Sequence, residues 1–229
     1  MNFIEFHPKI NWHNLCLNPS AIWIIQENLN KLNFFDWSLL SKYTKNIYFL
    51  EQNLDKVDWD CLFSNPNAIH IIENNLDKVN WSSLSINPNA IHILEQNLDK
   101  VHWRWLSHNP NAIHIIEKNL DKISWKFLSF NPNAIHILEQ NLDKVCWYWL
   151  CKNPNAIHII EQNLDKVNWL SLSTNPNAIH IIKQNLDKVN EEGWYFLSRN
   201  PNAIDIIEQN LHKIDLLGLI QNRNAIHLL

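Results

Sequence analysis

The stretch Trp81-Ser-Ser-Leu-Ser-Ile-Asn-Pro-Asn-Ala-Ile-His-Ile-Leu-Glu-Gln-Asn-Leu-Asp-Lys-Val101 decides the fold, because near-copies of it fill almost the whole chain of 229 residues. The copies begin every 22 residues, except for two steps of 25 residues that contain the insertions Asn33-Phe34-Phe35 and Glu191-Glu192-Gly193. The starting residues are Trp12, Trp37, Trp59, Trp81, Trp103, Trp125, Trp147, Trp169 and Trp194, with Leu216 in the tenth place. Self-similarity at a fixed period of this length indicates a repeat architecture. We therefore predict a single repeat domain over residues 1–229.

Each repeat opens with the signals of a short helix. The residue before the tryptophan is often one whose side chain can accept hydrogen bonds from the free N–H groups of a helix start. These predicted caps are Asp36, Asp58, Asn80, Ser124, Asn168 and Asp215. The tryptophan and the leucine three residues later, such as Trp59 and Leu62, would share one helix face. We expect a first helix of less than two turns in every repeat.

An Asn-Pro pair in the middle of each repeat predicts the start of a second helix. Asn65 would cap this helix and Pro66 would occupy its first position, where proline sacrifices no hydrogen bond. The apolar residues that follow have helical spacing. In the third repeat they are Ala68, Ile69, Ile72 and Leu76. We expect Asn75 to be a left-handed cap at the helix end and Asp77-Lys78 to form the link to the next repeat.

A repeat this small cannot bury enough apolar surface to fold alone, so neighbouring repeats must cover one another, with tryptophan and isoleucine side chains interlocking between them. We predict an all-α fold, a right-handed α-solenoid of about ten short helix-turn-helix repeats. The alternative is a leucine-rich-type horseshoe, whose repeats of about 20–29 residues also carry a recurring asparagine. In this chain the asparagine is one place out of register with that motif and the apolar spacing is helical, which favours helix pairs.

Composition narrows the classes of function. Hydrophobic residues make up 46% and charged residues 18%, which is typical of a folded protein. A net charge of −4 argues against a protein whose whole surface binds nucleic acid or anionic lipid. Only Gly193 and Gly218 are glycines, which disfavours hairpins and phosphate-binding loops. We expect no secretory signal and no membrane span, because the start of the chain lacks a basic, apolar leader and no apolar run reaches about 18 residues.

The four cysteines do not suggest a disulfide framework. Cys16 and Cys151 replace a recurring serine, Cys61 lies in an exposed column and Cys146 precedes a tryptophan. We interpret them as small residues of an intracellular protein in a reducing compartment, and a disulfide or metal-binding pair is the alternative.

The repeats that begin at Trp81 and at Trp125, with their shared Asn-Pro-Asn-Ala-Ile-His-Ile-Leu-Glu core, resemble short tandem repeats encoded by giant DNA viruses of amoebae. The resemblance covers almost the whole chain. It implies a viral repeat protein of unassigned activity, expressed in the cytoplasm of an infected host cell, and it carries over no catalytic residue.

A histidine column occupies one place on the second helix. It consists of His70, His92, His114, His136, His158, His180 and His227, with Trp23, Tyr48 and Asp205 as exceptions. Packed helices lie about 8–10 Å apart, whereas zinc ligands must all reach within about 2 Å of one ion. We therefore expect a structural ladder rather than a metal site, with Glu73 and Glu95, three residues on, as local partners. A pH-sensitive surface is the remaining alternative.

The sequence offers no candidate for catalysis. It contains no Cys-x-x-Cys, no nucleotide-binding loop and no isolated carboxylate pair of the kind that general acid–base chemistry requires. We predict a protein that is not an enzyme and has no cofactor and no metal.

The residues that vary between repeats are the candidates for binding. They lie one, two and five places after each starting tryptophan, and we call the residues at these three places the first-helix strip. Along the fifth to seventh repeats the strip is basic and aromatic, and similar residues return later, in the ninth. We predict partner binding by Arg104, Trp105, His108, Lys126, Phe127, Tyr148, Trp149, Lys152, Tyr195, Phe196 and Arg199. Phe130 lies in the same strip, whose positions Asp60, Ser82 and Ser83 are small or acidic in earlier repeats. The alternative is that neighbouring first helices bury these aromatic residues among themselves.

A constant frame that carries variable side chains favours a non-enzymatic scaffold for protein–protein interaction, with a host or viral protein as the partner. One alternative is single-stranded nucleic-acid binding along the basic-aromatic strip, where bases could stack on rings. Another is a self-assembling structural protein that associates through its C-terminal end at Leu228-Leu229. We expect no membrane partner.

Overall fold

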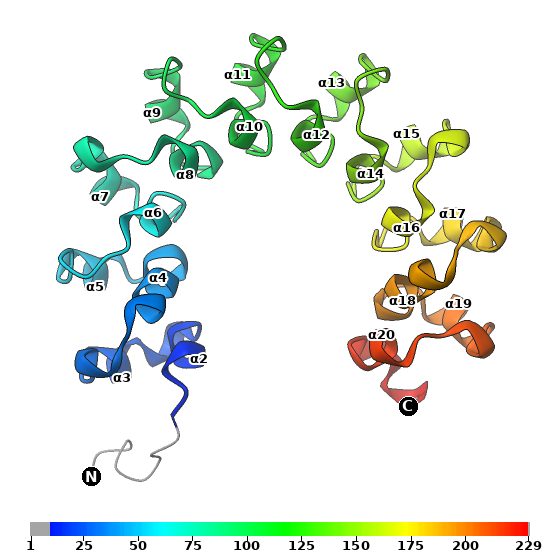
Figure 1. Ribbon diagram of the computed structural model, residues 1–229, viewed down its shortest axis with the longest axis horizontal. Helices are drawn as coiled ribbons and strands as arrows, with labels where there is room; N and C mark the ends of the chain where they lie inside the picture. Colours follow the sequence, from blue (N-terminus) through cyan, green and yellow to red (C-terminus); the bar gives the residue numbers. More distant parts are fainter. Residues whose placement is uncertain (1–9, 229) are drawn as a thin grey trace. The chain divides into compact units, whose positions relative to one another are not determined.

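The protein is helical throughout the part of the chain that its structure, a computed structural model, describes, namely residues 10–228 (Figure 1). The predicted all-helical fold of regularly repeating helices is therefore confirmed for these residues. The leucine-rich horseshoe is wrong, because each of its repeats would contribute a β-strand. The contacts divide the chain into two compact units, Met1–Ile115 and Ile116–Leu229.

The N-terminal unit consists of short α-helices with a few 3-10 helices between them, which carry the label η. Its elements are α2 (Trp12–Cys16), η1 (Pro19–Ala21), α3 (Ile22–Gln26), η2 (Leu29–Lys31), α4 (Phe34–Tyr43), α5 (Ile47–Glu51), α6 (Trp59–Leu62), α7 (Ile69–Glu73), η3 (Leu76–Lys78), α8 (Trp81–Ile86), α9 (Ile91–Glu95) and α10 (Trp103–Leu106). The boundary between the units falls inside α11 (Ile113–Glu117).

The C-terminal unit is built in the same way. Its elements are α12 (Trp125–Leu128), α13 (Ile135–Glu139), α14 (Trp147–Leu150), α15 (Ile157–Glu161), η4 (Leu164–Lys166), α16 (Trp169–Leu172), α17 (Ile179–Gln184), η5 (Leu186–Lys188), α18 (Glu191–Arg199), α19 (Ile204–Glu208), η6 (Leu211–Lys213), α20 (Leu216–Ile220) and η7 (Arg223–Leu228). Within each unit the first helices of successive repeats pack against one another, as α4 does on α6 and α18 on α20. The second helices form a separate row (Figure 1).

Side-chain caps and buried serines hold many of the first helices. Asp58 confirms its predicted role, because its Oδ1 accepts a hydrogen bond of 3.2 Å from the N–H of Cys61. The hydroxyl of Ser85 donates to the carbonyl of Trp81 at 2.7 Å and accepts from the N–H of His102, in the next repeat, at 3.0 Å. Equivalent bonds join Asp58 N to Ser41, Cys146 N to Ser129 and Asp215 N to Ser198. The serine therefore fixes where the following first helix begins.

The two insertions lengthen first helices at their N-terminal ends. Helices α4 and α18 have 10 and 9 residues, whereas α6 and α10 have 4. The prediction that Asp36 caps α4 is wrong, because the inserted residues move the cap back to Asn33. Asn33 Oδ1 accepts from the N–H of Asp36 at 3.1 Å, and the Asp36 carboxylate accepts from the N–H of Asn33 at 2.9 Å. Asn190 caps α18 in the same place.

The Asn-Pro pair does not start the second α-helix as predicted. Helix α7 begins at Ile69, three residues after Pro66. The N–H of Ala68 donates to the carbonyl of Asn65 at 3.2 Å, and the N–H of Asn67 donates to Asn65 Oδ1 at 2.9 Å. These short-range bonds close a tight turn, and only the residues after it make the longer-range bonds of an α-helix.

The same asparagine ties each repeat to the one before it. Asn87 is fully buried, and its Nδ2 donates to the carbonyls of Phe63 and Asn65, both at 3.0 Å. Equivalent pairs of bonds come from Asn109, Asn153, Asn175, Asn200 and Asn222. A second, more exposed series runs beside it, in which Asn89 Nδ2 donates to the carbonyl of Pro66 at 2.8 Å. The buried series gives the carbonyl of Phe63 a partner and adds a second partner to the carbonyl of Asn65, which also accepts from the N–H of Ala68.

The second helix ends without a left-handed residue. Asn75 has a φ of −137°, so the predicted left-handed cap is wrong, and no non-glycine residue between 10 and 228 has a positive φ. Instead, Asn75 Nδ2 donates to the carbonyl of Ile71 at 2.8 Å, which caps the helix through a side chain.

The repeat tryptophans are less buried than expected. Trp59 and most of its equivalents are half-buried, whereas Leu62, Ala68 and Ile72 are fully buried. The ammonium of Lys78, at the end of the same repeat, lies 4.1 Å from the centroid of the Trp59 ring. Lys100, Lys144, Lys166 and Lys213 cover Trp81, Trp125, Trp147 and Trp194 in the same way. The apolar stem and the ammonium group of a lysine thus cover the tryptophan ring, which the core buries only in part.

Candidate functional site

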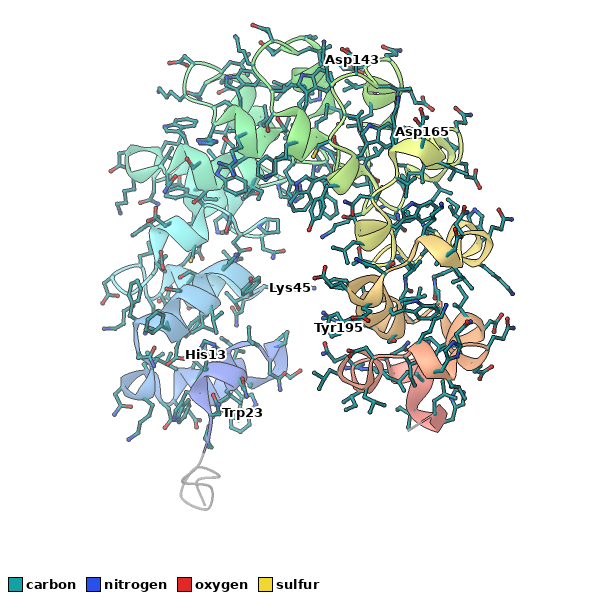
Figure 2. All side chains as sticks on the ribbon, turned by 45° about the vertical axis from the view of Figure 1, so that its right-hand side comes forward. His13, Trp23, Lys45, Asp143, Asp165 and Tyr195 are labelled. Atoms are coloured by element: carbon teal, nitrogen blue, oxygen red, sulfur yellow. The ribbon has the colours of Figure 1, made fainter. Side chains whose placement is uncertain are left out.

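The first-helix strip follows the row of first helices in each unit. In the C-terminal unit, Figure 2 shows Tyr195, a strip residue, on the side of the first helices. Asp143 and Asp165, from the Leu-Asp-Lys turns, lie at the opposite edge of that unit (Figure 2). The variable residues and the charged turns therefore occupy different faces.

A groove of about 340 Å³ runs along the strip of the N-terminal unit. Every residue that lines it comes from a strip position, one, two or five places after a repeat tryptophan. The lining residues are Lys42, Asp60, Cys61, Ser64, Ser82, Ser83, Ile86 and Trp105. The groove therefore crosses α4, α6, α8 and α10. The sequence placed Asp60, Ser82 and Ser83 on this face, but it did not predict a groove, which exists because small side chains here stand between larger ones.

Two polar side chains of the groove already have hydrogen-bond partners within the chain. Asp60 Oδ1 accepts a hydrogen bond of 2.7 Å from Asn80 Nδ2, and Ser64 Oγ donates to the carbonyl of Cys61 at 2.8 Å. Burial and the nearby charge of Asp58 raise the pKa of the Cys61 thiol, so this thiol is not activated as a nucleophile.

Three of the predicted binding residues lie at the end of this groove, on or next to α10. The guanidinium of Arg104 lies 5.5 Å from the centroid of the Trp105 ring, and the His102 ring lies 6.3 Å from the same ring. Burial lowers the pKa of His108, which keeps its imidazole neutral at neutral pH. The structure thus brings Arg104 and Trp105 into contact and leaves Arg104 exposed.

Six strip residues form one cluster in the C-terminal unit, and we call them the Trp149 cluster. They are Lys126, Phe127, Phe130, Tyr148, Trp149 and Lys152. The Trp149 ring stacks on Phe127 with centroids 6.5 Å apart, and meets Phe130 and Tyr148 edge-on at 5.6 and 5.4 Å. Trp149, Phe127 and Phe130 are half-buried, and Lys126 and Tyr148 are exposed. Lateral packing between first helices and an exposed charged rim therefore coexist in this cluster.

The remaining predicted residues lie further along the C-terminal unit, on α18. The rings of Tyr195 and Phe196 meet edge-on at 5.0 Å. Phe196 and Arg199 line a hollow of about 240 Å³ together with Thr174, Asn200 and Pro201. Thr174 is a strip residue of the eighth repeat that was not predicted to bind, because it is neither basic nor aromatic.

The histidine column pairs with glutamates of the preceding repeat. His92 Nε2 lies 2.8 Å from Glu73 Oε1, 19 residues earlier, and both side chains are about half exposed. The predicted partner of His92, Glu95 on the same helix, is wrong, because Glu95 instead pairs with His114 at 2.6 Å. The same spacing joins His70 to Glu51, His136 to Glu117, His158 to Glu139, His180 to Glu161 and His227 to Glu208.

The exceptions to this column are matched in pairs. Where the histidine is replaced by Asp205, the glutamate place in the preceding repeat holds Lys183, so the charges are reversed. Where it is replaced by Tyr48, the corresponding place holds the uncharged Gln26. Lys183 avoids a like-charge contact with Asp205, and Tyr48 and Gln26 are both uncharged, which indicates that the residues of the column match those of the preceding repeat.

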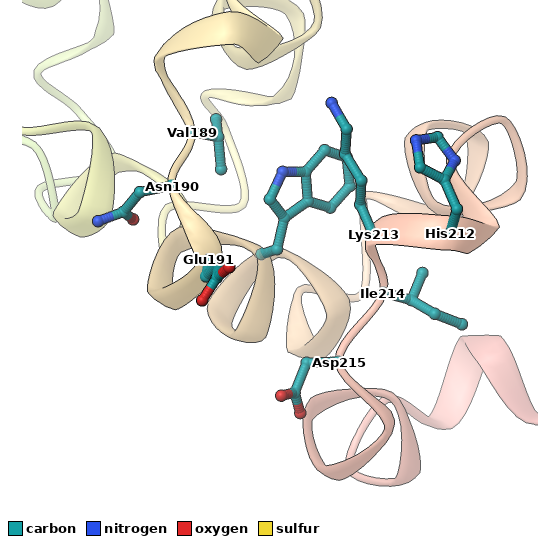
Figure 3. Close-up of a pocket in the computed structure, with 8 residues that line it drawn as sticks. Val189, Asn190, Glu191, His212, Lys213, Ile214 and Asp215 are labelled. Carbon is teal, nitrogen blue, oxygen red and sulfur yellow. The ribbon is translucent and has the colours of Figure 1, made fainter.

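A hollow of about 660 Å³ lies beside Trp194, at the second insertion. Its polar lining residues do not converge. Figure 3 shows Asn190 and Glu191 on one side, and His212 and Lys213 on the other. Small-molecule sites place a few polar groups around one point, so this arrangement does not favour such a site.

Among residues 10–228, no group of three or more His, Cys, Asp or Glu side chains is placed to hold a metal ion. The four cysteines are free thiols. The described helices are all too short or too polar to cross a bilayer. No family model matches the chain, and no curated protein or solved structure is significantly similar to it.

Proposed function

We propose that this chain is a non-enzymatic repeat scaffold that binds a partner protein along its first-helix strip. The observation that supports this most directly is the groove of the N-terminal unit, whose lining residues are all strip residues. Strip residues differ from repeat to repeat, while the residues that build the frame stay constant. Variable side chains on a fixed frame are how solenoid repeats present a binding surface.

The strip also has the composition of a docking surface. Tryptophan, tyrosine and arginine are the residues enriched at the energetic centres of protein interfaces, and the strip contains them at Trp105, Tyr148, Trp149, Tyr195 and Arg199. Half-buried aromatic residues such as Trp149 are already held in place by their neighbours, so little conformational freedom would be lost on binding.

Photo-crosslinking tests the proposal. A photo-reactive residue is placed at Ser83, in the groove, and in a matched protein at Gln96, which is exposed outside the strip. We expect a protein adduct from position 83 that is absent from position 96 and survives nuclease treatment. Equal adducts from both positions would contradict the proposal. A nuclease-sensitive adduct would support nucleic-acid binding instead, and an adduct with the chain itself would support self-assembly.

The number of repeats, the handedness of the solenoid and the origin of the protein are also proposals. We infer ten repeats that form a single right-handed solenoid, on the basis of the ten starting residues and the continuous asparagine series within each unit. The repeat motif alone is the basis for proposing a giant-virus protein that acts in the host cytoplasm. A crystal structure of the full chain would test the handedness.

A further inference from the structure

The first-helix strip is basic where the rest of the protein is acidic. From the fifth to the ninth repeat its fifteen positions hold the cations Arg104, Lys126, Lys152 and Arg199 and no aspartate or glutamate. The whole chain nevertheless has a net charge of −4. Interfaces match patches of opposite sign, so the partner segment should be acidic.

Two of these cations are held on one aromatic ring. In the Trp149 cluster the ammonium nitrogens of Lys126 and Lys152 lie 6.0 and 5.4 Å from the centroid of the Trp149 ring. Lys152 Nζ also lies 4.4 Å from the Tyr148 ring centroid and donates a hydrogen bond of 3.0 Å to Tyr148 Oη. Contacts of this kind orient a flexible lysine before a ligand arrives, which lowers the entropy lost on binding.

Both lysines keep hydrogen-bonding capacity for a ligand. Each ammonium has three N–H donors, and the hydrogen bond to Tyr148 Oη uses one donor of Lys152. Within the described residues, neither Lys126 nor Lys152 forms an ion pair with a carboxylate. The two cations are therefore positioned on a ring and are not neutralised by the chain itself.

The same cluster is a poor platform for stacking a nucleic-acid base. Phe127 stacks on the Trp149 ring, Phe130 and Tyr148 meet it edge-on, and Lys126 and Lys152 lie over it. A base that stacked on Trp149 would have to displace one of these groups. A carboxylate, in contrast, would pair with an ammonium group and would not need to displace a ring; Lys126 is exposed and Lys152 is half-buried.

An extended peptide has a spacing that fits two neighbouring cations. Alternate side chains of an extended chain point the same way and are about 6.6–6.8 Å apart. Both ammonium nitrogens lie within 6.0 Å of one ring centroid, so two carboxylates at this spacing could each reach one of them. We propose that the strip binds an extended acidic peptide segment, in which aspartates or glutamates at alternate positions pair with Lys126 and Lys152. This rests on the proposed function and names the chemistry of its partner.

The test measures fluorescence anisotropy of labelled peptides on the full chain. The main probe is a peptide of alternating Glu and Thr, which favours an extended form. Its controls are a peptide of the same composition with the glutamates in one block, peptides of alternating Lys and Thr and of alternating Ser and Thr, and oligothymidine. We expect the alternating Glu-Thr peptide to bind most tightly, with affinity that falls as salt is raised.

The key variant is Lys126→Met with Lys152→Met. It should weaken binding of the alternating Glu-Thr peptide roughly 3- to 30-fold, as expected for two exposed ion pairs. The matched control is Lys144→Met with Lys166→Met, which removes two ammonium groups from tryptophan rings outside the strip and should leave binding unchanged. Lys126→Arg with Lys152→Arg should retain binding, which separates loss of charge from loss of fold.

Each contrary outcome has a distinct meaning. Equal weakening by the two Met pairs, or no weakening by either, overturns the assignment to Lys126 and Lys152. Strip-dependent binding of the Ser-Thr or Lys-Thr peptide overturns the acidic partner but leaves the scaffold function standing. Binding of oligothymidine in place of all peptides, lost in the Lys126→Met and Lys152→Met pair, overturns both and supports nucleic-acid binding. Failure of every probe to bind also overturns the inference, while the crosslinking experiment independently tests the scaffold function.

Discussion

The side-chain amide of Asn87 donates a hydrogen bond of 3.0 Å to the backbone carbonyl of Asn65, 22 residues earlier. A second bond of 3.0 Å goes to the carbonyl of Phe63, and Oδ1 of Asn87 accepts from the N–H of Asn89 at 3.0 Å. One buried side chain therefore both shapes its own turn and joins two repeats. This dual role explains why an asparagine stands here in repeat after repeat.

Replacement of Asn87 by alanine should lower the free energy of unfolding by about 1.5–4.5 kcal/mol. The buried carbonyl of Phe63 would be left without a partner, at about 1–3 kcal/mol, and the carbonyl of Asn65 would lose one of its two partners, at about 0.5–1.5 kcal/mol. Urea denaturation followed by circular dichroism measures this. Asn89→Ala is the matched control, since its bond to the carbonyl of Pro66 is exposed, and it should cost about 0.5–1.5 kcal/mol. Equal losses in the two variants would show that the buried bonds contribute no more to the free energy of unfolding than the exposed one.

The charge-reversed pair of Lys183 and Asp205 predicts coupling between two repeats. Lys183→Glu places two acidic residues at paired positions and should destabilise the protein by about 0.2–1 kcal/mol. Adding Asp205→His restores the usual Glu–His combination and should recover the loss. A double-mutant cycle at low and high salt measures the coupling, which should shrink as salt is raised. Strictly additive effects would mean that the two positions do not interact.

Gly218 allows α20 to pack closely on α18. A Cβ at this position would collide with the backbone carbonyl of Tyr195, which cannot move aside as a side chain could. Gly218→Ala should therefore destabilise the protein by about 1–3 kcal/mol. Ser171 occupies the same place in the eighth repeat, and its buried hydroxyl has no hydrogen-bond partner among the described residues. Ser171→Ala should leave the melting temperature unchanged or raise it, and an equal loss in both variants would contradict the close-approach argument.

His108 predicts a loss of stability on acidification. Burial lowers its pKa in the folded protein, so the folded state binds its proton less readily than the unfolded state does. The stabilisation is complete above the ordinary histidine pKa of about 6.5 and is lost as the pH falls through the folded pKa. Wild type should therefore lose more stability than His108→Gln between neutral and mildly acidic pH. Urea denaturation of the two proteins at each pH measures this, and the difference between them cancels the effects of the other titrating groups. Parallel plots of unfolding free energy against pH would contradict the prediction.

The sequence predicted the helices because their signals are local. The apolar spacing of Ala68 and Ile72 and the cap at Asp58 depend only on residues within one turn, and both positions behave as predicted. The partners of Asn87 and His92 could not be predicted in this way, because they lie 19 to 24 residues earlier and are brought close only by the stacking of repeats. Spacing along a single helix therefore predicted the wrong glutamate as the partner of His92.

The position of the first-helix strip could be predicted from the sequence, but its side-chain contacts and its groove could not. The variation at places one, two and five after the tryptophan identified the strip. Whether Phe127 stacks on Trp149, or whether Ser82 and Ser83 leave a groove open, depends on the distance between neighbouring first helices, which a single sequence does not specify.

The matched substitutions along the histidine column restrict how such a gene can grow. Tandem arrays lengthen by duplicating a module. Most copies here could be inserted beside one another, because each carries a glutamate that can pair with the next module and a histidine that can pair with the preceding one. The module with Asp205 is different, since behind any neighbour with the usual glutamate it would place two negative side chains next to each other. Insertion of a new copy between the eighth and ninth modules is therefore disfavoured, because it would separate Lys183 from Asp205.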